Sequence, residues 1–234
     1  LLTLSLNKSE ARKIGFPLRN KLINREMKIA GGTFECCMKA FDNGISFNIA
    51  GGTHHAFSDR AEAFCLLNDQ AIAAQHLINK FNIRKILIID LDVHQGNGTA
   101  EIFRKNKKVF TFSMHGKKNY PFQKIKSDLD IELLDGTEDQ QYLDILNEKL
   151  NMVFDKIKPE FIFYLSGVDI LKTDKLGRLG MTLEGCKLRD EIVLNKCFEK
   201  KIPVQCSMGG GYSEELKIIL EAHSNTFRVA SKIF

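Results

Sequence analysis

The segment 85–91, KILIIDL, constrains the fold more than any other part of this sequence. It is an unbroken apolar run rich in isoleucine, with charge before it and an aspartate near its end. Such a run is typical of a strand buried on both faces of a parallel sheet. Four other segments have a similar composition and are also predicted to be strands: 45–49, 109–114, 159–165 and 202–208.

Helical patterns separate these predicted strands. They cover five segments: 62–79, 99–103, 139–157, 183–199 and 213–223. The alternation predicts an α/β fold with a mainly parallel central sheet and helices on both faces. Because α/β domains of this size often form one unit, we expect residues 1–234 to be a single domain. The stretch 119–132 lacks a clear period, and we interpret it as a loop near the site.

The composition excludes several classes of protein. The net charge of +5 is spread along the chain, and its densest basic stretch, 104–108, has no interleaved aromatic residues. We therefore predict no nucleic-acid partner. No apolar run reaches membrane-spanning length and no signal peptide is visible.

The six cysteines form no CxxC pair and are scattered through apolar segments. This pattern favours reduced, buried thiols in a cytoplasmic protein, although an even count also allows three disulfides.

Polar residues gather where the predicted strands end. In a parallel sheet, ligands bind outside the carboxyl ends of the strands. Glycines accompany each group and allow the backbone to approach a ligand closely. The four groups are Gly51-Gly52-Thr53-His54-His55, Asp90-Leu91-Asp92-Val93-His94, Ser166-Gly167-Val168-Asp169 and Gly209-Gly210-Gly211-Tyr212.

Asp90, Asp92 and His94 share one face if the strand continues, because alternate residues of a strand point the same way. Buried and unpaired, these groups would cost several kcal/mol per charge, and a cation removes that cost. Asp169 follows another strand and is the natural third ligand beside Asp92 and His94. One imidazole and two carboxylates leave a position open on a zinc ion, and iron or cobalt would also suit this set. The alternative is a hydrogen-bonded polar cluster without metal.

His54 and His55 suit acid–base chemistry at such a metal. A metal-activated water needs a base, and a leaving amine needs an acid. Asp90 is available to orient one of the rings, since Asp92 and His94 are assigned to the metal. Tyr212, after three glycines, can donate to a developing oxyanion.

These motifs, in this order, resemble the histone deacetylase family of zinc-dependent deacetylases with the arginase-like α/β fold. The resemblance extends from about residue 31 to residue 212. It is carried by GGTHHA, FCLLND, IDLDVHQGNGT, FSMH, SGVDIL with DKLGRLGMT, and GGGY.

The resemblance implies roles for individual residues. Asp92, His94 and Asp169 match the zinc ligands, and His54 and His55 match the tandem catalytic histidines. Asp90 matches the partner of the first histidine, Asn97 occupies the position that partners the second, and Tyr212 matches the transition-state tyrosine. The positions that match the substrate channel are Gly52, Phe64, Gly210 and Tyr212. Many members also bind K⁺, and the matching residues are Asp90, Asp92, His94, Ser113 and Met114.

The sequence also departs from the family pattern. His94-Gln95-Gly96-Asn97-Gly98 stands where HHGDG is commonest, so the usual aspartate partner of the second histidine is Asn97, which carries no charge. This form resembles the class IV branch and its bacterial relatives. Tyr120 or Phe122 is expected to form the second aromatic wall of the channel. The chain begins at Leu1, and we expect the N-terminal part of the family domain to be missing.

The expected activity is zinc-dependent removal of acetyl or longer acyl groups from lysine side chains of proteins. Two alternatives remain: hydrolysis of a small acylated amine such as an acetylpolyamine, and an inactive module that binds acyl-lysine. An arginase-like dimetal enzyme is disfavoured, because Gln95 and Asn97 stand where the second metal needs aspartates.

Overall fold

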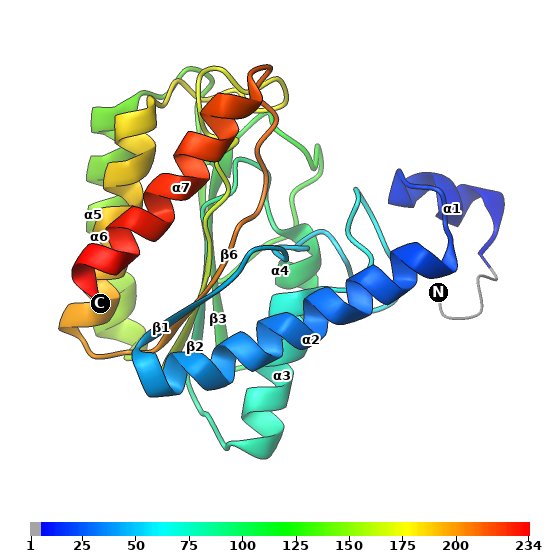
Figure 1. Ribbon diagram of the computed structural model, residues 1–234, viewed down its shortest axis with the longest axis horizontal. Helices are drawn as coiled ribbons and strands as arrows, with labels where there is room; N and C mark the ends of the chain where they lie inside the picture. The colour runs from blue at the N-terminus through cyan, green and yellow to red at the C-terminus, as the bar shows by residue number, and fades with distance from the viewer. Residues whose placement is uncertain (1–5) are drawn as a thin grey trace.

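All six strands that residues 6–234 form run parallel in one sheet, which is seen nearly edge-on in the computed structural model of Figure 1. Residues 1–5, which the single-domain prediction includes, lie outside the described part of the chain. The strand order across the sheet is β1 (Ile45–Asn48), β6 (Val204–Ser207), β5 (Phe161–Leu165), β2 (Ile86–Asp90), β3 (Val109–Gly116) and β4 (Leu129–Leu133).

Helices cover both faces of this sheet (Figure 1). One face carries α5 (Asp139–Ile157), α6 (Leu183–Glu199) and α7 (Leu216–Ile233). The other carries α2 (Asn20–Asn43), α3 (Asp69–Lys80) and α4 (Asn97–Phe103), while α1 (Lys8–Ile14) lies away from the sheet (Figure 1).

Strand β2 explains why the sheet needs two helical layers. Leu87 and Ile89 belong to the core under α5–α7, whereas Ile86 and Ile88 belong to the core under α2 and α3. All four are at most 1% exposed. Alternate side chains of this apolar run therefore pack into two cores, one on each face of the sheet. Helices cover both cores, which confirms the α/β prediction.

One predicted helix boundary near the site was wrong. The helix expected over 62–79 begins only at Asp69, where the Asn68 side chain accepts from the Ala71 N–H at 3.0 Å. Before it, Glu62 and Cys65 pair through their backbones, and Ala63 and Phe64 have φ of 46° and 67°. Such left-handed residues cannot continue a helix.

Other segments also differ from the prediction. The supposed loop 119–132 includes the start of β4, whose Leu129 pairs with Phe112 of β3. The helix expected over 213–223 begins at Leu216 and continues to Ile233. Gly31-Gly32-Thr33 is expected to begin a helix, but α2 already begins at Asn20 and has both glycines in its middle.

The strand order places the polar loops side by side. β1, β6, β5 and β2 are consecutive neighbours, and each precedes one of the four polar groups of the sequence. Their carboxyl ends share one edge of the sheet, so the topology gathers these groups there.

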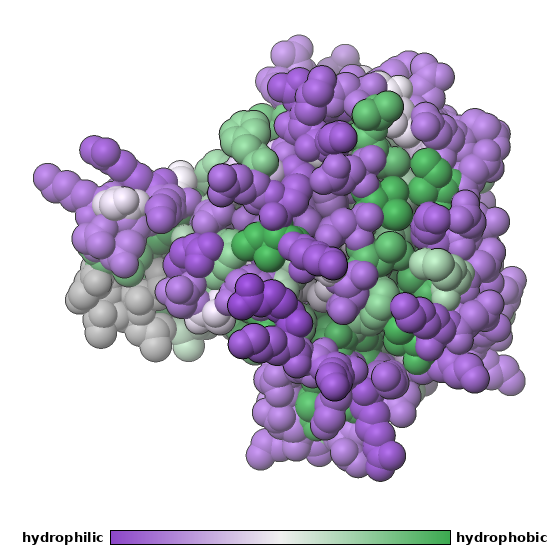
Figure 2. All heavy atoms as spheres, turned by 180° about the vertical axis from the view of Figure 1, so that it is seen from behind, coloured by the Kyte–Doolittle hydropathy of each residue, from purple (hydrophilic) through white to green (hydrophobic). Residues whose placement is uncertain are grey.

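No helix among residues 6–234 is long and apolar enough to cross a bilayer. The face in Figure 2 is largely hydrophilic, with apolar side chains gathered near its middle.

Two glycines make a matched test of this packing. An added Cβ at Gly31 would meet nothing within 4 Å, whereas at Gly98 it would lie 2.2 Å from the Ala56 carbonyl oxygen and 2.8 Å from that of His54. We expect Gly31→Ala to raise the free energy of unfolding by about 0.5–1 kcal/mol. Gly98→Ala should lower it by about 1–3 kcal/mol, because the backbone of 54–56 must shift. Urea unfolding measures both, and an unimpaired Gly98→Ala variant would contradict the packing described.

Candidate active site

Asp92, His94 and Asp169 converge at the carboxyl edge of the sheet. Nδ1 of His94 lies 3.1 Å from Asp92 Oδ1 and 3.1 Å from Asp169 Oδ2. One donor atom from each of the three residues lies within 4.8 Å of the others. The two aspartates follow the adjacent strands β2 and β5, so Asp169, the predicted third ligand, lies beside Asp92 and His94 as expected from the sequence.

The electrostatics of this cluster call for a positive charge. Asp92 and Asp169 are 2% and 0% exposed. Burial and the neighbouring Asp92 raise the pKa of Asp169 to about 7. Although burial opposes a charge on His94, its hydrogen bonds to Asp169 and Asp92 raise the pKa of that imidazole to about 10. One imidazole nitrogen and two carboxylates pointing at one position fit a divalent cation with nitrogen and oxygen ligands, such as zinc.

Backbone groups hold the carboxylates in this orientation. Gly210 N–H donates to Asp92 Oδ2 at 2.8 Å, and Val93 N–H donates to Asp169 Oδ1 at 2.9 Å. An added Cβ at Gly210 would lie 2.2 Å from Asp169 Oδ2, so only glycine fits there. Gly210, predicted as a channel position, therefore also supports two predicted metal ligands.

A buried arginine joins the loops that carry the ligands. Arg189 of α6 is 0% exposed, and its guanidinium donates to the carbonyl oxygens of Gly167, Ser166 and Leu91. Asp190 accepts from Arg189 Nε at 2.9 Å and compensates its charge. Nothing in the local sequence distinguishes Arg189 from a surface arginine on a helix, so its role was not predicted.

His54 and His55 have different partners, as expected. His54 Nδ1 lies 2.7 Å from Asp90 Oδ2, and His55 Nδ1 lies 2.7 Å from Asn97 Oδ1. Burial opposes a charge on His54, but the Asp90 carboxylate outweighs it and raises the pKa of His54 to about 9. Burial and the neighbouring His54 hold the pKa of His55 well below its usual range. The different partners thus shift the pKa values of the two imidazoles in opposite directions.

Asp69 fixes the loop that delivers these histidines. It is fully buried, and Oδ1 accepts from the N–H groups of Gly52 and Thr53 at 3.0 and 2.9 Å and from the Thr53 hydroxyl at 2.7 Å. The other oxygen accepts from the Thr33 hydroxyl at 2.7 Å. Asp69 was part of a matched motif, but the sequence did not assign it this role.

The same loop must cross two strand ends to reach β2. It follows β1, passes over β6 and β5, and meets Asp90 at the end of β2 and Asn97 at the start of α4. Gly52 has a φ of 78°, and an added Cβ there would lie 3.0 Å from Gly209. The glycines of the two loops thus permit the close crossing.

Tyr212 is anchored through its backbone. Asp174 Oδ2 accepts from the Tyr212 N–H at 2.6 Å, while Asp174 Oδ1 accepts from Leu176 and Gly177, each at 2.8 Å. Burial and the nearby Asp92 raise the pKa of Tyr212, so its hydroxyl stays protonated and can donate.

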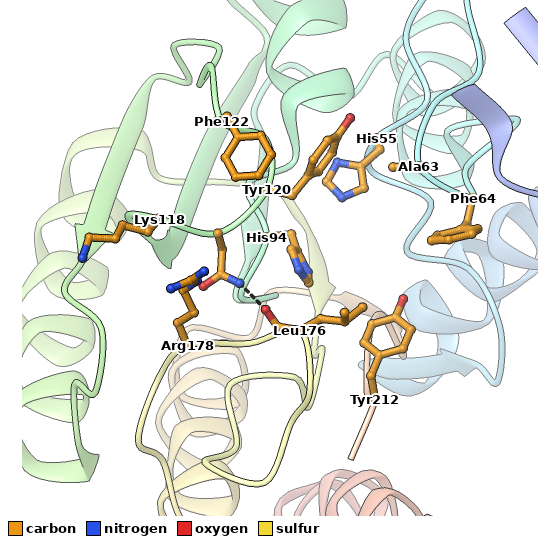
Figure 3. Close-up of a pocket in the computed structure, with 11 residues that line it drawn as sticks. His55, Ala63, Phe64, His94, Lys118, Tyr120, Phe122, Leu176, Arg178 and Tyr212 are labelled. Carbon is orange, nitrogen blue, oxygen red and sulfur yellow. Dashed lines mark hydrogen bonds between the residues drawn. The ribbon is translucent and has the colours of Figure 1, made fainter. Parts of the chain in front are cut away.

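Two connected hollows lead to these groups. An inner cavity of about 190 Å³ is lined by Gly52, both histidines, the ligands Asp92 and His94, Gly210 and Tyr212. An outer cavity of about 410 Å³ shares His55, Phe64, His94 and Tyr212 with it. In Figure 3, Tyr120 and Phe122 flank the outer cavity opposite Phe64 and Tyr212, with His55 and His94 between them. Both candidates for the second aromatic wall therefore line it.

The expected K⁺ residues are close along the sheet. Asp90 and Ser113 are paired in the β2–β3 ladder, and Met114 is fully buried. The Ser113 hydroxyl lies 2.9 Å from His115 Nδ1. K⁺ binding here stays a prediction.

Comparison with known proteins assigns the family. Residues 4–227 match the histone deacetylase domain. The chain belongs to the histone deacetylase family.

Individual relatives align with most of this chain at different levels of identity. An uncharacterized protein of Picosynechococcus sp. is 41% identical over 98% of this chain and 77% of its own length. Histone deacetylase 2 of Arabidopsis thaliana is 32% identical over 91% of this chain, which spans 56% of that protein. The structure of a histone deacetylase homolog complexed with SAHA superposes with a TM-score of 0.81 at 25% identity, over 98% of this chain and 65% of that one. The predicted family and fold are confirmed.

Removing a carboxylate tests the metal site. We expect Asp92→Asn and Asp169→Asn each to lose bound zinc, because a neutral amide is a weaker ligand and leaves the remaining charges unbalanced. Asp90→Asn is the matched control, because Asp90 orients His54 instead and should retain the metal. Metal content after dialysis, read by atomic emission, distinguishes these results. Full zinc occupancy in Asp169→Asn would refute the ligand assignment.

Proposed function

We propose that this protein is a zinc-dependent amidohydrolase that removes acetyl or longer acyl groups from lysine side chains of proteins. One observation carries the proposal: Asp92 and His94, the two differently partnered histidines and Tyr212 line a single cavity, and Asp169 Oδ2 lies 3.1 Å from His94 Nδ1. Each is a component that hydrolysis of an amide requires.

Asp92, His94 and Asp169 would hold the metal. The chemistry supplied there by a bound zinc ion is that of a Lewis acid, which makes an acyl carbonyl more electrophilic and water more acidic. The aromatic walls Phe64, Tyr120 and Phe122 orient the acyl-lysine stem and exclude water from it.

His55 is the proposed general base. Its Nδ1 donates to Asn97, so Nε2 presents a lone pair toward the cavity and can accept a proton from the attacking water. The same nitrogen then returns the proton to the departing amine. His54, paired with Asp90, keeps its positive charge and stabilises the negative charge that develops beside it.

Tyr212 is the proposed donor to the oxyanion. Its hydroxyl is protonated and its loop is fixed by Asp174. A carboxylic acid and a free amine are the products, and the atoms balance with one water consumed.

The mouth of the cavity supports a peptide over a polyamine. Lys118 and Arg178 line it, and both pair with the single carboxylate of Asp135, at 3.5 and 3.4 Å. Two cations against one anion repel a polycationic substrate.

Two further expectations accompany the proposed function. Gln95 and Asn97 support placement in the class IV-like branch. The six cysteines are all free, which supports a reducing, cytoplasmic setting.

A panel of acyl-lysine peptides, from acetyl to myristoyl, together with acetylated polyamines tests the proposed function. We expect zinc-dependent release of carboxylic acid from at least one peptide, and loss of that release with a chelator. Faster turnover of the polyamines would transfer the proposal to small acylated amines. Zinc binding without hydrolysis of any member would indicate an inactive binding module.

Tyr212→Phe tests the oxyanion donor. We expect kcat to fall about 10²–10³-fold, because one preorganised donor is lost, with zinc content unchanged. Tyr142→Phe is the matched control: Tyr142 is buried in the core, and its hydroxyl has no partner among the described residues. It should leave kcat unchanged, whereas a fully active Tyr212→Phe enzyme would remove Tyr212 from the mechanism.

A further inference from the structure

Glu62 lies behind the histidine pair and belongs to no part of the proposed machinery. It begins the 62–65 turn, and its side chain is 19% exposed. Its Oε1 accepts from Asn97 Nδ2 at 3.1 Å and from the Tyr120 hydroxyl. Its Oε2 accepts from Arg60 Nε at 3.3 Å. Three segments distant in the sequence therefore meet at one carboxylate.

These contacts determine which way the Asn97 side chain faces. A carboxylate only accepts hydrogen bonds, so Asn97 must offer its NH₂ group to Glu62 and its oxygen to His55. The Gly98 N–H, 3.1 Å from the same oxygen, is consistent with this orientation. His55 Nδ1 must then carry the proton, and Nε2 is left free to act as the base.

The contrast with His54 shows what Glu62 adds. His54 has a carboxylate directly on Nδ1, whereas His55 has a neutral amide. The negative charge nearest to that amide's NH₂ group is Glu62, one hydrogen bond further out. Tyr120, held by the same carboxylate, places its ring perpendicular to His55 at 5.0 Å.

We infer that Glu62 is a positioning residue for His55. Through its hydrogen bond to Asn97 it fixes the His55 tautomer and places a negative charge one hydrogen bond further from the ring than Asp90 is from His54. It also holds the Tyr120 side chain in the wall of the cavity. The inference rests on the proposed function for its catalytic consequence. The hydrogen-bonded arrangement itself does not depend on turnover.

Substitutions at Glu62 separate its two contributions. Glu62→Gln keeps an acceptor for Asn97 and Tyr120 but removes the charge, and Glu62→Ala removes both. We expect kcat on the best acyl-lysine peptide to fall about 10–100-fold in Glu62→Ala and less in Glu62→Gln. KM should stay nearly unchanged in Glu62→Gln, which still holds Tyr120, and rise in Glu62→Ala, which does not. Glu101→Gln is the control, since Glu101 lies on the neighbouring helix α4 and its carboxylate accepts only from Ser58 among the hydrogen bonds described. It should leave kcat at the wild-type value.

A second-site change distinguishes positioning from folding of the turn. Asn97→Asp places a carboxylate directly on His55. In the Glu62→Ala background it should raise kcat about 10-fold, whereas in the wild-type background it should lower kcat because two carboxylates then oppose each other. A turn that had simply lost its fold would not be rescued by Asn97→Asp.

The ¹⁵N shifts of the His55 ring in the zinc-loaded protein provide a readout independent of turnover. We expect the Nδ1–H tautomer in the wild type and a mixture of tautomers in Glu62→Ala. Unchanged shifts in Glu62→Ala, wild-type kcat in that variant, or no rescue by Asn97→Asp would each overturn the inference. If the wild type hydrolyses no acyl amine, the proposed function fails while the ring shifts still decide the role of Glu62.

Discussion

The convergence of two buried carboxylates on His94 is the constraint that the rest of the structure serves. Each aspartate satisfies one oxygen with a backbone N–H from another loop, Gly210 for Asp92 and Val93 for Asp169. Arg189 donates hydrogen bonds to backbone carbonyl groups near both aspartates in the sequence, those of Leu91 and Gly167. Because buried charge without compensation costs several kcal/mol, this arrangement is stable only when every one of these partners is in place.

Much of this site was predictable because its polar residues interrupt strongly apolar strands. Asp92, His94 and Asp169 stand out for that reason, and parallel topology requires them to meet at one edge. The pairing of Asp90 with a histidine could be predicted because Asp92 and His94 were assigned to the metal, which left Asp90 free to orient a ring. The identity of Asn97 as the other partner came from the family resemblance.

The supporting residues were not predictable, and the cause is physical. Asp69 and Arg189 bind backbone groups of remote loops, and such contacts leave no local pattern in the sequence. The helix predicted over 62–79 was wrong in its first turns because Ala63 and Phe64 adopt a left-handed backbone conformation. Alanine and phenylalanine rarely do so, and nothing in the sequence indicates it here. The first turns of helix α2 were missed because its packing outweighs the cost of two internal glycines, which the sequence suggests as a helix start.

The crossing of the 51–55 loop over two strand ends has a consequence for how the protein folds. His54 contacts Asp90 36 positions away, His55 contacts Asn97 42 positions away, and Asp92 contacts Gly210 118 positions away. Contacts at such separations carry a large loop-closure entropy and form slowly. In the native sheet β6 and β5 lie between β1 and β2, so the histidines meet their partners across both of these strands. We therefore expect assembly of the site to be a late event in folding.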